Sequence, residues 1–274
     1  MLKEAVTGIL SETEIEDLYG AFDQIGDIII LRIPDSLISK KETIGKVLLE
    51  KVKTAKSVFY QSSPVSGDFR TRKLELLAGE DKTETEYKEH GCRFIVDVEK
   101  AFFSPRLSTE RDRIANLIHD GETVINMFGG VGMFSIIAAK KKKCKVYNID
   151  INPDAIRLCE QNINLNKLLG KVESLTGDAS KIIEERLTGI GDRILMLLPE
   201  RSDEFLDSAI KATKKNGIIH YYCHIHGDKK NQVSGLAKEH FLEVMKNKVE
   251  ILGSKIVRPV GPRFYQAVVD AKLL

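Results

Sequence analysis

The sequence has no tryptophan, few cysteines, no strong charge of one sign and no long uninterrupted apolar run. Its four cysteines show no Cys-x-x-Cys spacing, which argues against a zinc site or a disulfide framework and predicts a reducing compartment. The formal net charge of +2 means that any surface for nucleic acid must be local. The longest apolar stretch, about residues 124–139, is broken by glycines and too short for a membrane span, and the N-terminus lacks signal-peptide character. We therefore expect a soluble cytoplasmic protein.

A glycine-rich turn is the most informative feature that is present. Val124–Asn126 predicts a strand, a helix is predicted to follow the turn, and the turn itself reads Phe128, Gly129, Gly130, Val131 and Gly132. A second β-branched segment ends at Asp150, eighteen residues after the last of these glycines. This pattern is typical of the first βαβ unit of a nucleotide-binding sheet, where glycines let backbone N–H groups approach a ligand and the acid accepts ribose hydroxyls.

The details of the turn favour S-adenosylmethionine over a dinucleotide. A dinucleotide fingerprint has a third glycine where this chain continues Met133-Phe134-Ser135, so a pyrophosphate is poorly accommodated. S-adenosylmethionine carries no phosphate and needs a close backbone, an acid for its ribose and a later polar group for its adenine, for which Asp178 is the candidate. The predicted cofactor-binding residues are Phe128, Gly129, Gly130, Val131, Gly132, Asp150, Ile151, Asp178 and Ala179.

The 274 residues suffice for two ordinary domains, and the pattern changes near residue 98. Residues 1–98 predict a smaller α+β domain, with helices near 11–22 and 42–52 and strands near 27–33, 57–60, 72–78, 83–87 and 93–98. Residues 99–274 alternate helix and strand and end in two closing strands near 250–257 and 264–274. Such alternation predicts a doubly wound, Rossmann-like α/β sheet.

The segment between the two domains, and a loop upstream of it, are rich in arginine. A helix that starts after Pro105 and is capped by Ser108 or Thr109 would explain the presence of one hydroxyl residue and of the nearby acid Glu110. It would not account for the arginines, which we interpret as a local RNA-binding face: Arg70, Arg72, Arg106 and Arg111. Phe102 could stack a base there, although adjacent aromatics after a strand usually pack.

Two other polar groups have ordinary structural interpretations. The run Lys140–Lys143 suits the solvated carboxyl end of a helix, where cations complement the dipole. His220, His224 and His226 lack a carboxylate at ligand spacing, so we do not expect a metal site. Tyr221 and Tyr222 are predicted to be core and pocket wall.

The chain resembles the archaeal and eukaryotic tRNA guanine-N1 methyltransferases over roughly residues 20–274. The resemblance rests on the run from Phe103 to Arg111, on Leu77-Ala78-Gly79-Glu80, on the turn from Met127 to Phe134, on Asn148-Ile149-Asp150-Ile151-Asn152-Pro153 and on Ile218-Ile219-His220-Tyr221-Tyr222. These enzymes methylate the guanosine 3′ of the anticodon, and a sister group transfers the aminocarboxypropyl group of the same cofactor in wyosine synthesis. The resemblance implies a class I methyltransferase fold, S-adenosylmethionine as cofactor, tRNA as partner and no metal; we expect a monomer.

The resemblance also implies roles for individual residues. Glu110 matches the base that removes the N1 proton of guanine, a contribution typically of about 10² to 10⁴ in rate. Arg70 matches an arginine that stabilises negative charge at guanine O6, with Arg72 as the alternative. Arg106 would hold the flipped nucleotide or its phosphate. The implied substrate contacts are Phe102, Pro199 and Arg72.

This sequence departs from the family pattern at two positions. Leu197 stands where the methyltransferases usually have an asparagine that helps to hold the target base, and Asn126 stands where an aspartate usually precedes the glycine turn. The chain also lacks the extra N-terminal domain with which many members grip the tRNA elbow, so we expect looser discrimination among tRNAs. The aminocarboxypropyl transferases carry Gly-Asn where this chain has Arg106-Leu107. We therefore rank methyl transfer first, aminocarboxypropyl transfer second and non-catalytic RNA binding third.

Overall fold

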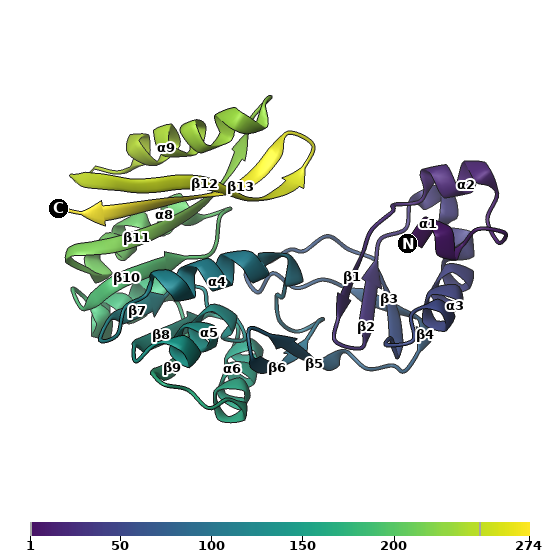
Figure 1. Cartoon of the computed structure of the whole chain (residues 1–274), viewed down its shortest axis with the longest axis horizontal. Coiled ribbons are helices and arrows are strands. Elements are labelled where there is room, and N and C mark those ends of the chain that lie inside the picture. Colours follow the sequence, from purple (N-terminus) through teal and green to yellow (C-terminus); the bar gives the residue numbers. More distant parts are fainter. Residues whose placement is uncertain (1, 247) are drawn as a thin grey trace. The chain divides into compact units, whose positions relative to one another are not determined.

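The structure of the protein is a computed structural model that describes residues 2–246 and 248–274. It contains two compact units, the first ending at Pro105 and the second comprising Arg106–Leu274. Each unit has its own buried apolar cluster. We describe the two units separately (Figure 1).

The first unit is a small α+β fold. Its elements are α1 (Leu2–Ala5), α2 (Glu12–Asp17), β1 (Phe22–Ile25), β2 (Ile28–Leu31), a 3-10 turn (Asp35–Lys40), α3 (Lys41–Lys51), β3 (Ser57–Gln61) and β4 (Leu74–Gly79). The four strands form one sheet in the order β1-β2-β3-β4, in which only the β2–β3 pair is parallel. Strand β2 is wholly buried, as its unbroken apolar run predicts.

Two expectations for this unit need correction. The acidic helix predicted for residues 11–22 ends at Asp17, because Leu18 is extended, and Phe22 already begins β1. The strand predicted near residues 72–78 is β4, which begins only at Leu74 and ends at Gly79. Gly79 has a φ of +89°, and a Cβ there would lie 2.0 Å from the carbonyl oxygen of Lys56, so only glycine fits this close crossing.

A separate antiparallel hairpin completes the first unit. It pairs β5 (Glu84–Glu89) with β6 (Cys92–Asp97) and has its own two-stranded sheet. A 3-10 turn, Pro105–Leu107, then precedes the first helix of the second unit.

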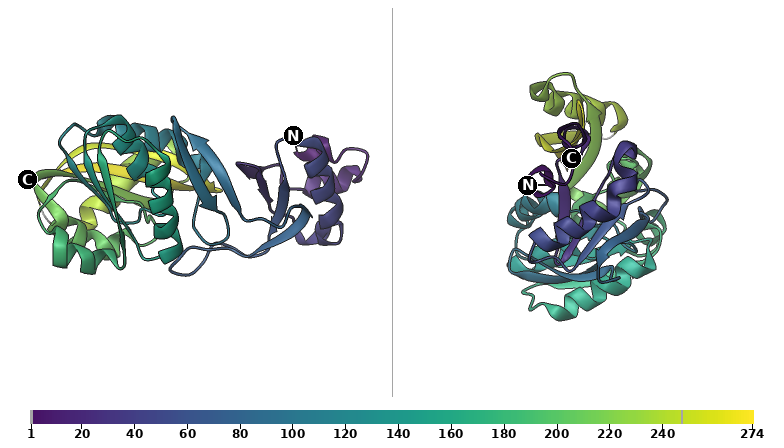
Figure 2. Two further views of the ribbon diagram at one scale, coloured as in Figure 1. Left: turned by 90° about the horizontal axis from the view of Figure 1, so that it is seen from below. Right: turned by 90° about the vertical axis from the view of Figure 1, so that its right-hand side faces the viewer.

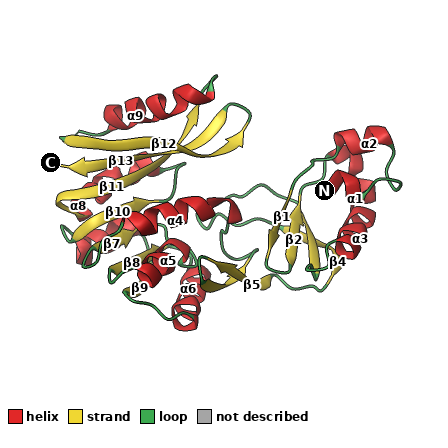
Figure 3. Ribbon diagram, viewed as in Figure 1, coloured by secondary structure: helices red, strands yellow, loops and turns green. Residues whose placement is uncertain are grey.

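The second unit is a seven-stranded α/β fold in which helices and strands alternate (Figure 3). Its helices are α4 (Ser108–Leu117), α5 (Met133–Lys141), α6 (Pro153–Leu165), α7 (Ala179–Ile182) followed by a π-helical turn (Ile183–Leu187), α8 (Ser202–Ala212), and α9 (Val233–Val244) preceded by a 3-10 turn (Lys230–Gln232). Its strands are β7 (Thr123–Asn126), β8 (Lys145–Asp150), β9 (Lys171–Thr176), β10 (Gly191–Met196), β11 (Thr213–His226), β12 (Val249–Gly261) and β13 (Phe264–Leu273).

The strand order is β12-β13-β11-β10-β7-β8-β9. Strands β7 to β11 are parallel, whereas β13 is antiparallel to both of its neighbours. The doubly wound arrangement expected from the sequence is therefore confirmed, with the two closing strands forming an antiparallel hairpin that adds to the sheet through β13. Strand β11 continues past its parallel neighbour β10 and pairs with β13 as far as His226.

The two faces of this sheet carry different helices (Figures 1 and 2). Alternation along β11 shows the division: the hydroxyl of Tyr222 contacts α4, whereas the ring of Tyr221 contacts Phe241 of α9. Both tyrosines are fully buried, so the core part of their predicted role is confirmed. Among the described residues, no helix is long and apolar enough to cross a membrane.

Candidate active site

The glycine turn after β7 brings backbone close to the end of β8. Gly130 and Gly132 have φ values of +53° and +89°, a region that glycine occupies without strain. A Cβ on Gly129 would lie 2.1 Å from Oδ1 of Asn148, so a side chain has no room there. The turn thus requires glycine for both conformation and close approach, as the sequence predicted.

Asp150 is fixed at this turn by backbone donors. Its Oδ2 accepts a hydrogen bond from the Gly130 N–H at 2.7 Å, and its Oδ1 accepts one from the Asn152 N–H at 2.9 Å. The next loop is joined to the same place, because the Gly177 N–H donates to the Asp150 carbonyl at 2.9 Å. The carboxylate is therefore oriented in advance at the strand end where an acid accepts the hydroxyls of a ribose.

Other predicted cofactor residues surround this point. Asp178 is the N-cap of α7 and accepts from the Lys181 N–H at 3.0 Å, which already gives it a structural task. Ala179 is buried, while Ile151 is 44% exposed, an unusual position for an isoleucine directly after Asp150. Among the remaining turn residues, Val131 is buried and the half-buried Phe128 packs edge-on against Phe205 of α8 at 4.9 Å between ring centroids.

A buried acceptor without a donor supports the presence of a ligand here. Asn126 ends β7 and is fully buried, and its Nδ2 donates to Ser135 Oγ at 3.1 Å. Ser135 donates in turn to Oδ1 of Asn148 at 2.6 Å, which fixes the direction of the chain of hydrogen bonds. Oδ1 of Asn126 then has no partner among the described residues. Such orphan acceptors are rare, and the α-ammonium group of S-adenosylmethionine is a donor that this position fits.

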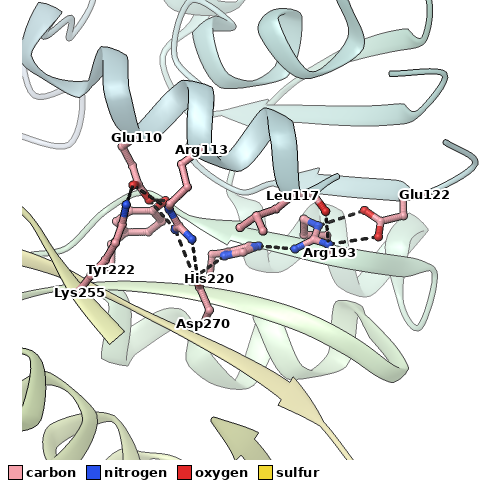
Figure 4. Close-up of polar contacts among 9 residues, drawn as sticks. All are labelled: Glu110, Arg113, Leu117, Glu122, Arg193, His220, Tyr222, Lys255 and Asp270. Carbon is pink, nitrogen blue, oxygen red and sulfur yellow. Dashed lines mark hydrogen bonds and ion pairs between the residues drawn. The ribbon is translucent and has the colours of Figure 1, made fainter. Parts of the chain in front are cut away.

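Glu110 lies at the centre of a second polar cluster (Figure 4). It is 3% exposed, and it accepts hydrogen bonds from two nitrogens of Arg113 at 2.9 and 2.6 Å and from the hydroxyl of Tyr222 at 2.7 Å. The ammonium of Lys255 lies 3.0 Å from its Oε2. Burial by itself would raise the pKa of Glu110, but the hydrogen bonds and charge of Arg113, with help from Tyr222 and Lys255, lower it. The carboxylate is ionised at neutral pH.

The cluster continues across the strands β13, β11 and β10 as one chain of polar contacts (Figure 4). Arg113 also binds Asp270 of β13, whose Oδ1 lies 2.6 Å from Nδ1 of His220. The other ring nitrogen of His220 lies 2.8 Å from Arg193, which binds Glu122 at 3.0 Å and the Leu117 carbonyl at 2.9 Å.

Two titratable members of this chain of contacts, Asp270 and His220, have shifted pKa values. Burial would raise the pKa of Asp270, but His220 and Arg113 lower it far below its usual range, whereas burial lowers the pKa of His220. No group of three or more metal-binding side chains occurs among the described residues. His220 instead joins Asp270 to Arg193 through its two ring nitrogens.

Sequence reasoning missed the three donors to Glu110 and also Asp270, the second partner of Arg113. Arg113, Tyr222 as a hydrogen-bond donor, Lys255 and Asp270 were not predicted. Two local signals existed: residues three apart share a helix face, which relates Glu110 to Arg113, and residues two apart share a strand face, which relates Tyr222 to His220. No local signal pointed to Lys255 or Asp270.

The predicted helix cap is wrong. The N-cap of α4 is Leu107, which makes no side-chain cap, and Ser108 and Thr109 lie inside the first turn. The 3-10 turn at Pro105–Leu107 leads directly into the helix, so no hydroxyl is placed at the cap position. Glu110 is likewise no capping group, because its carboxylate bonds to side chains of α4 and the sheet.

The first unit brings two predicted substrate-binding residues together. The guanidinium carbon of Arg70 lies 4.1 Å from the ring centre of Phe102, a cation–π contact. Arg70 also has a φ of +51°, rare for a residue with a side chain and of the kind found at functional positions. Arg72 is engaged differently, with Nε donating to the Val98 carbonyl at 3.3 Å and Nη1 to Gln61 at 3.4 Å. Burial lowers the pKa of Arg72, which suits a structural role.

The arginines of the second unit also differ from one another. Arg106 is exposed, as an RNA contact requires, whereas Arg111 is 2% exposed with its guanidinium 5.9 Å from the Phe134 ring centre. Arg111 therefore does not contribute to a charged surface, and its assignment to the RNA face is wrong. After β10, Pro199 is buried and Leu197 is half-buried.

The fold and this site define a class. A parallel sheet with one antiparallel strand inserted beside its edge, a glycine turn after the first parallel strand, an acid after the next and an orphan acceptor below the turn constitute a Rossmann-like S-adenosylmethionine-dependent methyltransferase domain. The chain belongs to the TRM5/TYW2 family: the TRM5/TYW2 methyltransferase domain matches residues 85–251 and the TYW2 N-terminal domain matches residues 2–83.

Two relatives illustrate the range of this family. The tRNA (guanine(37)-N(1))-methyltransferase Trm5b of Pyrococcus abyssi is 41% identical over 92% of this chain and 74% of its own length. The tRNA 4-demethylwyosine(37)-methyltransferase Taw21 of Saccharolobus solfataricus is 37% identical over 94% of this chain and 95% of its own length.

Solved structures agree with this assignment. The chain matches aTrm5 in its complex with tRNALeu with a TM-score of 0.86 and 37% identity, covering 100% of this chain and 78% of that one. It matches Pyrococcus horikoshii TYW2 in complex with MeSAdo with a TM-score of 0.76 and 28% identity, covering 100% and 98%. The recognition, fold and cofactor class predicted from the sequence are confirmed.

Proposed function

We propose that this enzyme transfers a methyl group from S-adenosylmethionine to N1 of the guanosine at position 37 of tRNA, the nucleotide 3′ of the anticodon. The family and the relatives named for this reaction support the proposal. The observation that carries it is Glu110, a carboxylate that is 3% exposed yet kept ionised by Arg113 and Tyr222. We further propose that the enzyme acts as a monomer in the cytoplasm.

The chemistry needs a base because guanine N1 carries a proton. When bound, S-adenosylmethionine supplies a methyl group attached to a positively charged sulfur. Glu110 accepts the N1 proton, and this leaves the N1 electron pair free for the methyl group that the bound cofactor would donate, with the neutral sulfur as the leaving group. Glu110 then returns its proton to water. General-base help of this kind contributes about 10² to 10⁴ in rate.

The remaining predicted residues would hold the base. We propose that Arg70 stabilises negative charge at guanine O6; the engagement of Arg72 with Val98 and Gln61 favours Arg70 over its alternative. Phe102 and Pro199 would contact the flipped base, and the exposed Arg106 would contact a phosphate.

The direct test is transfer to an unmodified tRNA transcript with methyl-labelled and, separately, carboxyl-labelled cofactor. We expect methyl label in the RNA and none when position 37 is changed from guanosine. Glu110→Gln should lower single-turnover transfer at neutral pH by about 10² or more, with less loss at high pH where guanine ionises unaided. Glu204→Gln is the matched control, since Glu204 forms an exposed pair with Arg201 on α8. Carboxyl label in the RNA, or a full-rate Glu110→Gln enzyme, would contradict the proposal.

A second candidate is favoured by Leu197. A leucine cannot form the hydrogen bond of the asparagine that it replaces, so the target base could differ from unmodified guanine. The Saccharolobus relative is named for methylation of 4-demethylwyosine in tRNA, and the TYW2 enzymes form the other branch of the family. Methyl label that enters only tRNA already carrying demethylwyosine would support this candidate, and carboxyl label would support aminocarboxypropyl transfer.

A further inference from the structure

The hydrogen-bonding capacity of Glu110 is already filled. A carboxylate has about four lone-pair positions. On Oε1 they are taken by Nη2 of Arg113 at 2.6 Å and by the hydroxyl of Tyr222 at 2.7 Å. On Oε2 they are taken by Nε of Arg113 at 2.9 Å and by the ammonium of Lys255 at 3.0 Å. A guanine N1–H therefore has no acceptor position until one of these donors leaves.

The three donor residues differ in how easily they can leave. Arg113 is held on its other side by Asp270, so its guanidinium is fixed between two carboxylates. Tyr222 is fully buried in the sheet. The side chain of Lys255 is 41% exposed and reaches Glu110 with one ammonium on a flexible stem. Lys255 is the donor that can be exchanged at the lowest cost.

We propose that Lys255 is a displaceable positioning residue, whose ammonium occupies the Oε2 lone pair of Glu110 that the target N1–H takes when the base enters. The inference rests on the proposed function above, because it assumes that Glu110 is the base. Strand register places Lys255 for this exchange: it pairs with Val268 of β13, and Val268 pairs with Tyr222 of β11, so the lysine and the tyrosine lie on the same face of the sheet.

The exchange would couple base strength to substrate entry. With Lys255 in place, the carboxylate has an additional cation and is a weaker base; with Lys255 displaced, its affinity for a proton rises at the moment when N1–H arrives. Return of the ammonium after methyl transfer would favour release of the proton to water. The charged and titratable groups that face Glu110 are Arg113 of α4, Tyr222 of β11, Lys255 of β12 and, through Arg113, Asp270 of β13.

The test compares the pH profiles of kcat/KM and of kcat for the whole enzyme acting on a tRNA transcript. The acid limb of kcat/KM reports the free enzyme, and the acid limb of kcat reports the complex. In Lys255→Met the limb of kcat/KM should move up by about one pH unit, because one cation about 3 Å away is lost, so kcat/KM below the limb should fall about tenfold. The limb of kcat should stay in place, because wild-type Lys255 has already left in the complex.

Three further variants define the result. Lys255→Arg keeps the cation and should keep the wild-type limb of kcat/KM. Lys255→Gln repeats the charge loss with a polar side chain, in case the methionine variant does not fold. Lys238→Met, on the exposed face of α9, should leave both profiles unchanged.

Each other outcome overturns the inference. If both limbs move together, Lys255 stays on Glu110 in the complex and is a permanent partner. If neither limb moves and kcat/KM instead falls equally at every pH with a smaller salt dependence, Lys255 contacts an RNA phosphate. Glu110→Gln separates this inference from the proposed function: a full-rate Glu110→Gln enzyme removes the base itself, whereas a slow Glu110→Gln enzyme with unmoved limbs in Lys255→Met removes only the exchange.

Discussion

Asp270→Asn is expected to destabilise the second unit substantially at neutral pH. The Asp270 side chain is 16% exposed, receives two hydrogen bonds from Arg113 and lies 2.6 Å from Nδ1 of His220. Removing one member of a buried ion pair typically costs about 3 to 5 kcal/mol, and we reduce this to about 2 to 3 kcal/mol because the amide keeps one acceptor and the site is not wholly dry.

The pH dependence of this loss has a definite sign. The folded-state pKa of Asp270 is depressed, so its contribution is fully present above the unfolded value of about 3.9 and is lost as pH falls through the folded value. Urea unfolding followed by far-UV circular dichroism should therefore show a large difference between wild type and Asp270→Asn at pH 7 and a smaller one at pH 3.

A matched control is the same change in an exposed pair. Asp228 contacts Arg263 at 3.1 Å with 73% of its side chain exposed, so Asp228→Asn should cost less than about 1 kcal/mol through that pair. A cost for Asp270→Asn as small as that of the control at pH 7, or a difference from wild type that is unchanged at pH 3, would refute the reasoning.

Three further outcomes follow from the site. Asp150→Ala should weaken S-adenosylmethionine binding by about 1.5 to 3 kcal/mol without unfolding, and calorimetry with unchanged affinity would remove it from the cofactor site. Arg106→Glu should weaken tRNA binding and reduce the slope of log affinity against log salt by about 0.7 to 0.9, whereas Lys142→Glu should matter less; the reverse order in a filter-binding titration would move the RNA face. Leu197→Asn should raise methyl transfer to unmodified guanosine if N1 is the target, and an unchanged or lower rate would favour a different base.

The cofactor turn was predictable because its requirements are local. Gly129, Gly130 and Gly132 show in sequence the close approach and positive φ that the turn needs, and Asp150 ends the adjacent parallel strand, whose position follows from the βαβ rule. The alternation of helix and strand after residue 106 follows from the same kind of short-range pattern.

The surroundings of Glu110 were not predictable in the same way. Asp270 and Arg113 are 157 positions apart, and their contact depends on the register of β13 against β11 and on the packing of α4 over that sheet. A shift of one residue in β13 would turn Asp270 to the opposite face. Arg111 was chosen for its place in a motif, but the helix turns it into the interior and presents Arg113, three residues from Glu110, to the carboxylate.

The order β12-β13-β11 also constrains how the molecule is assembled. Strand β12 is synthesised before β13 yet lies outside it, so β11 stays an open edge until β13 arrives, with the hairpin docking through its second strand. Such an unpaired edge is a template for association with other chains during biosynthesis. Asp270 arrives on β13, so one event both closes the aggregation-prone edge and supplies the counter-ion of Arg113. A nascent chain that has not docked this hairpin therefore exposes the edge of β11 and leaves Arg113 without Asp270. Docking of the hairpin is thus the one structural step that chaperones and proteases would need to monitor.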